Sequence, residues 1–226
     1  MGQYYRPVSI DAKEFVYTHD AAKSLGDGFC GQKLMEHSWL ANKVCAAVLL
    51  MLKEGGAWHK TRIVWCGDYA DSHPELILQD EDSGEDFEAN YYQFASEKFT
   101  QVNPTEAVKV SRMKVEGSDE TVPVVKGYIL NHDTKEYVCL QDTPDSTAAW
   151  IEGEPGWKIH PLPLLTCDGN GRGCGDFRGN GRGYGDFRGN DEGLIGRWAY
   201  NRISFQTKKP LKAEGFEKLE FDLIDA

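Results

Sequence analysis

The chain has 226 residues, 40% of them hydrophobic, and a net charge of −11 at pH 7. A chain of this length buries a core large enough to fold without disulfide staples. The apolar run that ends at Leu52 is far too short to span a bilayer, and MGQYYRPVSID lacks the apolar segment of a secretory signal. We therefore expect a cytoplasmic protein with no membrane partner. Its six cysteines form no Cys-x-x-Cys pair, which disfavours a structural zinc site.

The first part of the chain predicts two strands followed by one long helix. Strand-forming residues fill segments 3–11 and 14–19. The stretch SWLANKVCAAVLLMLKEGG then repeats apolar side chains at helical spacing and predicts a buried helix over about 38–54. Ser38 is the expected N-cap, and Gly55 the expected residue just past the helix end.

The rest of the chain predicts strands joined by hairpins and long loops. Strand patterns occur at 61–67, in a hairpin over 124–140, and at 195–206 and 218–225. We also expect an edge strand at 160–167, because its two prolines cannot donate to a strand ladder. Residues 90–99 fit a helix and a strand equally. Because strands and helices do not alternate, the sequence predicts a single α+β domain over 1–226, with a mainly antiparallel or barrel-like sheet.

The negative charge is concentrated in the segment PELILQDEDSGEDFE, residues 74–88, which contains seven acidic and no basic residues. Such a segment is most often a solvated acidic loop. The alternative is an acidic inhibitor that docks on a basic face of a host protein through Glu81, Asp82, Glu85 and Asp86. Such a docking surface would also repel nucleic acid, and we do not expect a nucleic-acid partner.

Residues 169–188 are a tandem repeat, GNGRGCGDFR followed by GNGRGYGDFR. Glycine supplies no apolar surface, so this segment cannot form part of a core. Its backbone N–H groups and arginines suit an anion such as phosphate or carboxylate. We expect a loop over 169–190 that binds a small anionic, nucleotide-like ligand through Arg172, Asp176, Arg178, Arg182, Asp186 and Arg188. The alternative is that the two aspartates pair with the arginines, so that the loop satisfies itself.

A second polar group follows the predicted strand at 61–67. The sequence WCGDYADSH places Asp68, Asp71 and His73 directly after a buried strand, where they suit a divalent metal or acid–base chemistry. A metal-dependent hydrolase is therefore one alternative, and simple capping of a turn is the other. The chain has no nucleophile elbow and no metalloprotease motif, so the sequence favours a non-enzymatic binding protein, with this metal as its one candidate cofactor.

Five segments carry a resemblance to other proteins: MGQYYRPVSID, GQKLMEHSWLAN, KTRIVWCGDYAD, YILNHDTKEYV and IHPLPLLTCDGNGRGCGDFRGN. They resemble a family of uncharacterised proteins from gut bacteria and their phages. The glycine unit usually occurs once in that family, so the second copy at 179–188 is a departure. The resemblance implies no fold, activity or ligand. It implies a phage or mobile-element origin, and with it a role in host takeover or counter-defence.

Overall fold

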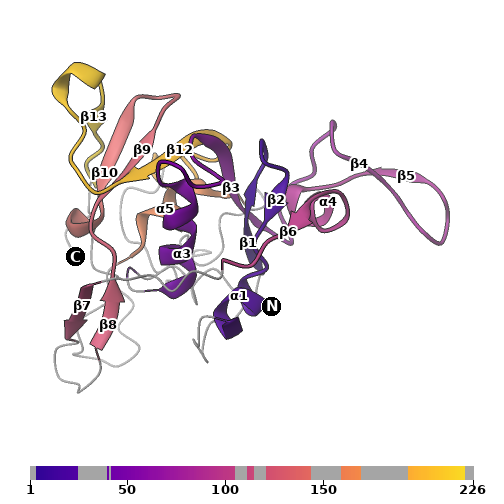
Figure 1. Ribbon diagram of the computed structural model, residues 1–226. Helices are drawn as coiled ribbons and strands as arrows, with labels where there is room; N and C mark the ends of the chain where they lie inside the picture. The colour runs from indigo at the N-terminus through magenta and orange to yellow at the C-terminus, as the bar shows by residue number, and fades with distance from the viewer. Residues whose placement is uncertain are drawn as a thin grey trace, which may run out of the picture.

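The computed structural model describes residues 4–24, 40, 42–104, 111–114, 121–143, 159–168 and 193–221. The described chain is a mixed α+β structure built on a mostly antiparallel sheet, as the sequence predicts. Its strands form an open sheet, and they do not close into the barrel that the sequence left open (Figure 1). The glycine repeat and Ser38 lie outside the described residues.

The main sheet has the strand order β13-β10-β9-β12-β3-β1-β2-β6, with β11 beside β3. The bounds are β1 (Tyr5–Ser9), β2 (Glu14–Phe15), β3 (Thr61–Gly67), β6 (Thr100–Gln101), β9 (Tyr128–Asn131), β10 (Glu136–Cys139), β11 (Cys167–Asp168), β12 (Asn201–Gln206) and β13 (Glu217–Lys218). Three pairs are parallel, namely β2 with β6, β10 with β13, and β3 with β11. Two hairpins stand apart: β4 (Ile77–Gln79) with β5 (Asp86–Glu88), and β7 (Ser111–Lys114) with β8 (Thr121–Val124).

The described helices are short. They are α1 (Thr18–Ser24), α3 (Lys43–Leu52), α4 (Tyr91–Lys98) and α5 (Pro161–Thr166), with 3₁₀ turns η1 (Leu140–Asp142) and η2 (Lys212–Glu214). Helix α3 lies within the predicted helix over 38–54, but it begins at Lys43. Asn42 is its N-cap, because the Asn42 side chain accepts hydrogen bonds from the backbone amides of Val44 and Cys45. It ends at Leu52 with Lys53 as its C-cap, before the predicted stop at Gly55.

One predicted strand is helical, and another is helical in its second part. Residues 160–167 were expected to form an edge strand, but Pro161–Thr166 is helix α5. Proline suits the first turn of a helix, where no amide donor is needed, and His160 Nδ1 accepts from the Leu162 amide to cap that turn. Similarly, the strand expected at 14–19 ends at Phe15, and α1 begins at Thr18.

Other predicted elements are confirmed or shortened. The hairpin within 124–140 and the strand at 61–67 are present as β9–β10 and β3. The ambiguous segment 90–99 is helix α4, whose start is fixed by a reciprocal capping box between Asn90 and Gln93. Of the strand predicted at 218–225, β13 contains only residue 218, and residues 222–225 lie outside the described part of the chain. The acidic segment 74–88, expected as a loop, contains the β4–β5 hairpin.

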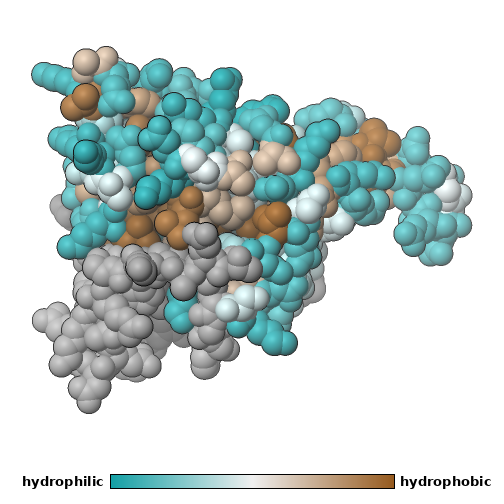
Figure 2. Space-filling view, viewed as in Figure 1, coloured by the Kyte–Doolittle hydropathy of each residue, from teal (hydrophilic) through white to brown (hydrophobic). Residues whose placement is uncertain are grey.

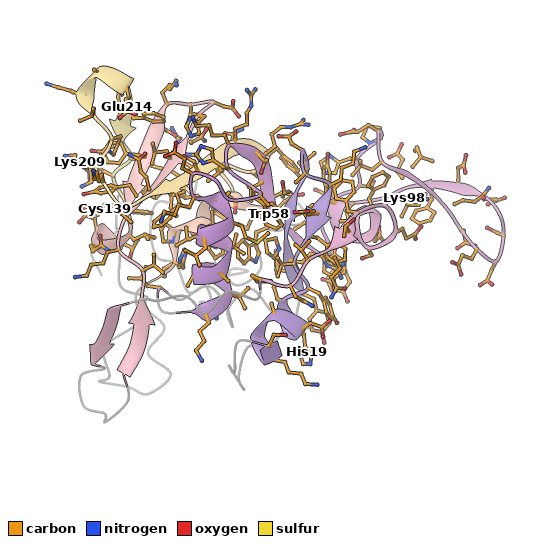
Figure 3. All side chains as sticks on the ribbon, in the orientation of Figure 1. His19, Trp58, Lys98, Cys139, Lys209 and Glu214 are labelled. Atoms are coloured by element: carbon orange, nitrogen blue, oxygen red, sulfur yellow. The ribbon has the colours of Figure 1, made fainter. Side chains whose placement is uncertain are left out.

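The two faces of the sheet bury two separate apolar clusters. Neighbouring residues of a strand point to opposite faces, and in β3 Ile63 belongs to the larger cluster while Val64 belongs to the smaller one. The larger cluster packs under α3 and α5. It includes Trp58, which lies in the middle of the molecule and donates its indole N–H to Glu14 (Figure 3). The smaller cluster packs under α4 and β4.

Candidate ligand-binding site at the carboxyl end of β3

Strands β3 and β11 run parallel, so both reach the same edge of the sheet at their carboxyl ends. Cys66 pairs with Asp168, and Asp168 is the residue directly before the glycine repeat. The turn after β3 contains Asp68, Asp71 and His73, which the sequence analysis proposed for metal binding or acid–base chemistry. We call Asp68, Asp71, His73, Asp168 and Tyr200 the polar edge. The turn after β3 and the glycine repeat, which the sequence analysis selected separately, therefore both follow strands that end at this edge of the sheet.

A chain of hydrogen bonds joins three residues of the polar edge. The Tyr200 hydroxyl donates to Asp168 Oδ2. Because the phenol has a single proton, His73 Nε2 is the donor in its 2.9 Å contact with the Tyr200 oxygen. His73 Nε2 also lies 3.7 Å from Asp168 Oδ2, and His73 Nδ1 lies 3.7 Å from a carboxylate oxygen of Glu75. Sequence alone gave no reason to pair His73 with these partners.

Aromatic packing holds this chain in place. The ring centroids of His73 and Tyr200 are 5.3 Å apart, and Tyr91 lies 5.2 Å from His73 and 5.5 Å from Tyr200. Each of the two contacts of His73 is edge-to-face, a favourable geometry for aromatic pairs. The three rings contact one another directly, so the imidazole has little freedom to turn away from Asp168.

The backbone at Tyr200 is held in a conformation that residues with side chains seldom adopt. Its φ angle is 66°, in the left-handed region, which costs about 1 kcal/mol for a residue with a Cβ atom. The Tyr200 amide donates to the Ile63 carbonyl oxygen at 2.9 Å and so fixes this conformation against β3. The result is that the phenol points at Asp168.

Burial sets the electrostatics of the polar edge. The pKa of Asp168 is raised, chiefly because burial disfavours its charged form, while the hydrogen bonds from Tyr200 and the proximity of His73 oppose the rise. The carboxylate of Asp71 raises it further. The pKa of Tyr200 is raised well above its ordinary value, first by burial and then by Asp168. At neutral pH Tyr200 is therefore a neutral phenol and a hydrogen-bond donor.

Asp68 has a different role from His73. Its Oδ1 accepts from the Tyr4 amide at 3.0 Å, and its own amide donates to the Tyr4 carbonyl oxygen at 2.9 Å. The Asn90 amide group donates to the carbonyl oxygens of Asp68 and Ala70, so the turn after β3 is tied to the start of α4. Burial raises the pKa of Asp68. The three residues predicted together therefore have different roles. His73 is part of the hydrogen-bonded chain, and the charge of Asp71 raises the pKa of Asp168. Asp68 holds the turn to Tyr4 by hydrogen bonds.

Two exposed aromatic rings lie next to this turn. Tyr4 is 42% exposed and Tyr69 is 51% exposed. Tyr4 is held to Asp68 by the backbone contacts above, and Tyr69 is the next residue in the chain. Exposed aromatic faces of this kind suit stacking against a planar ring such as a nucleobase.

A buried arginine supports the polar edge from the next strand. Arg6 of β1 pairs with Cys66, which in turn pairs with Asp168, so the three residues form one row across the sheet. Arg6 is only 6% exposed, and its guanidinium carbon lies 3.5 Å from the ring centroid of Tyr92 on α4. Its Nη1 donates to Ser96, also on α4. Within the part of the chain that the structure describes, Arg6 has no ion pair with a carboxylate. The sequence gave no signal for this residue.

The described residues on either side of segment 169–192 are held in the same part of the fold. On one side, α5 runs into β11 and ends at Asp168. On the other, the Gly196 amide donates to the Leu164 carbonyl oxygen and the Trp198 amide to the Leu165 carbonyl oxygen. A Cβ atom at Gly196, whose φ angle is +71°, would lie 2.6 Å from the Cys167 carbonyl oxygen, so only glycine allows this close approach.

The predicted ligand contacts themselves lie outside the described residues: Arg172, Asp176, Arg178, Arg182, Asp186 and Arg188. The metal site predicted at Asp68, Asp71 and His73 stays a prediction. Over the residues that the structure describes, no group of three or more histidine, cysteine, aspartate or glutamate side chains is placed to hold a metal ion.

Comparisons of the chain with protein-family models, with curated proteins and with solved structures found no match. Across the described segments, no helix combines the length and the apolar character needed to cross a membrane.

Proposed function

We propose that the protein is a non-enzymatic binding protein for a small anionic, nucleotide-like ligand, held between the glycine–arginine repeat and the polar edge. The observation that carries this proposal is the convergence of two segments. Asp168, from which the repeat leaves, lies in hydrogen-bonded contact with Tyr200 and beside His73, the residue that the sequence had already singled out.

The chemistry of the two segments is complementary. The polar edge contains three aspartates, which suit the hydroxyl groups of a sugar because hydroxyls donate to carboxylates. Arginines of the repeat supply the positive charge that a phosphate needs, with Arg172 only four residues beyond Asp168. The exposed ring of Tyr69 is available for stacking against a base. One ligand with a base, a sugar and a phosphate would use all three features.

Titration calorimetry against a panel of linear and cyclic nucleotides tests the proposal. We expect at least one nucleotide to bind the wild-type protein, and Arg172→Ala combined with Arg182→Ala to weaken that binding at least tenfold, about 1.4 kcal/mol. Tyr200→Phe removes one hydroxyl from the polar edge and should weaken binding less. Arg202→Ala is the matched control, because Arg202 pairs with Asp133 away from this edge and should leave the affinity unchanged.

Two outcomes would contradict the proposal. One is the absence of heat with every nucleotide in the panel. The other is binding that the arginine variants leave intact, which would mean that the arginines of the repeat pair with Asp176 and Asp186 instead. The resemblance to phage-borne proteins implies a setting for this function, in which the protein sequesters a nucleotide signal of host defence.

A further inference from the structure

The hairpin of β4 and β5 extends from the body of the molecule as a two-stranded arm (Figure 1). We call residues 75–88 the acidic arm. Figure 2 shows it extending well beyond the rest of the described surface, with a hydrophilic tip and hydrophobic surface nearer the body. Among the described residues, each of its strands therefore has one neighbouring strand and one outer edge.

The hydrogen bonds within the arm define its outer edge. The backbone amide of Asp80 donates to the Glu85 carbonyl oxygen, and the backbone amide of Ala89 donates to the Leu76 carbonyl oxygen. In an antiparallel pair of strands, hydrogen-bonded residue pairs alternate with pairs that are not hydrogen-bonded. Asp86 and Glu88 fall between these positions, so their backbone N–H and C=O groups point away from β4. In the described chain these two residues make no backbone hydrogen bond on that side. All three residues of β5 are exposed.

An exposed strand edge is a template for another strand, and proteins usually cover, twist or shorten it. The edge of β5 is short and acidic, which keeps two copies of this chain apart. The same edge remains open to a partner of the opposite charge.

The tip of the arm is held by hydrogen bonds within the arm itself. At its tip, Asp80 Oδ1 accepts hydrogen bonds from the amides of Asp82 and Ser83 and from the Ser83 hydroxyl. These bonds, together with the surrounding amides, keep the pKa of Asp80 below its ordinary value. A preformed edge avoids the entropy cost of ordering on binding.

The side chains define the partner. Ile77 is 45% exposed and Phe87 is 38% exposed, so the arm offers apolar contacts on both faces. Around them stand seven acidic side chains and no basic one. Strand addition draws its affinity from the main chain and its selectivity from side chains at alternate positions, so the matching strand alternates basic and apolar residues.

We propose that the outer edge of β5 binds an extended, lysine- or arginine-rich segment of a partner protein by strand addition. Glu75 at the base of the arm contacts His73, but the outer edge of β5 contains no residue of the polar edge, so variants at Asp86 test this proposal without altering the residues of the first one.

Fluorescence anisotropy with a labelled peptide of four Lys-Val repeats tests the proposal on the full chain. A second peptide with proline in place of every valine keeps the charge but cannot form a strand ladder. We expect the valine peptide to bind at least about tenfold more tightly than the proline peptide, and its affinity to fall with added salt. Equal affinity for the two peptides, or no binding of either at low salt, would overturn the proposal.

A pair of variants at Asp86 locates the edge. Asp86→Pro removes the outward amide but no bond within the hairpin, whereas Asp86→Asn removes only the charge. We expect the proline variant to bind the valine peptide at least about tenfold more weakly, and the asparagine variant to lose much less. Amide exchange at Glu88 should also slow when peptide is added to the wild type. Equal affinities of the two variants, or unchanged exchange at Glu88, would show that charge alone attracts the peptide, and would refute strand addition.

Discussion

The two faces of the main sheet bury different kinds of side chain. On one face, α3 and α5 cover a large cluster that includes Trp58, Trp65 and Trp198. On the other face, α4 and β4 cover a smaller cluster, and the same face holds the buried guanidinium of Arg6 and the half-buried carboxylate of Asp168. Burying charged groups costs stability unless they are compensated. The comparison indicates that the apolar face supplies the stability that allows the other face to hold polar groups in fixed positions.

The apolar face should therefore be the more sensitive to a simple loss of volume. Leu49 of α3 is fully buried, and we expect Leu49→Ala to lower the free energy of unfolding by about 3 kcal/mol, because it removes apolar contacts and leaves a cavity. Urea denaturation measures this change. Leu211→Ala, at a side chain that is 69% exposed, is the control and should have little effect. Similar losses for the two variants would contradict the claim that the larger apolar cluster supplies the stability.

On the other face, the largest single effect should come from Arg6. Its guanidinium stacks on Tyr92 and donates to Ser96, so it connects β1 to α4. We expect Arg6→Ala to cost about 2 kcal/mol, through lost cation–π contact, packing and hydrogen bonding. Arg6→Lys keeps the charge but loses the planar stacking, and should cost less. A neutral effect of Arg6→Ala in the same denaturation experiment would mean that α4 is held by its apolar contacts alone.

The smallest expected effect is the pH dependence that Asp168 gives to the free energy of unfolding. It measures directly what burial of this polar group costs the second face. Its pKa is higher in the folded protein than its unfolded value of 3.8. A group of this kind stabilises the fold when protonated, and that contribution is lost as the pH rises through the raised pKa. Asp168→Asn cannot ionise, yet it keeps an oxygen that accepts from Tyr200. The variant should therefore gain stability relative to the wild type as the pH rises from 3 to 8.

Paired urea titrations of the two proteins across this range provide the measurement. Taking the difference between them removes the contributions of the other titrating groups. A difference that grows as the pH falls would mean that the hydrogen bond from Tyr200 and the nearby His73 outweigh the burial of Asp168, and a constant difference would mean that these effects cancel.

The sequence predicted those parts of the fold that depend on local pattern. The buried apolar run within 61–67, the two strand-forming arms of 124–140 and the apolar run after Asn42 correspond to β3, the β9–β10 hairpin and α3. The prediction was wrong at 160–167, because proline was treated as an edge-strand residue when it also suits the first turn of a helix. The same local reasoning missed the β4–β5 hairpin, because the charges of that segment concealed its strand-forming residues.

The site was predicted only in part, because its contacts are not local. His73 was selected for its spacing to Asp68 and Asp71, but its hydrogen-bonded chain runs through Tyr200 to Asp168, far along the sequence. No spacing rule connects these residues. They meet because the two-residue strand β11 pairs with β3, and such a short strand leaves no periodic pattern to detect. The position of Asp168 directly before the repeat was the one available signal.

The way in which the residues flanking segment 169–192 are held affects how this protein evolves. Before the segment, Asp168 pairs with β3, and after it the Gly196 and Trp198 amides donate to carbonyl oxygens of α5. The free energy of closing a chain segment grows with the logarithm of its length, so loss of the ten-residue copy 179–188 should change the stability by only about 0.5 kcal/mol. Duplication of the unit is then nearly neutral for the fold, and copy number can drift or be selected through the ligand without disturbing the scaffold.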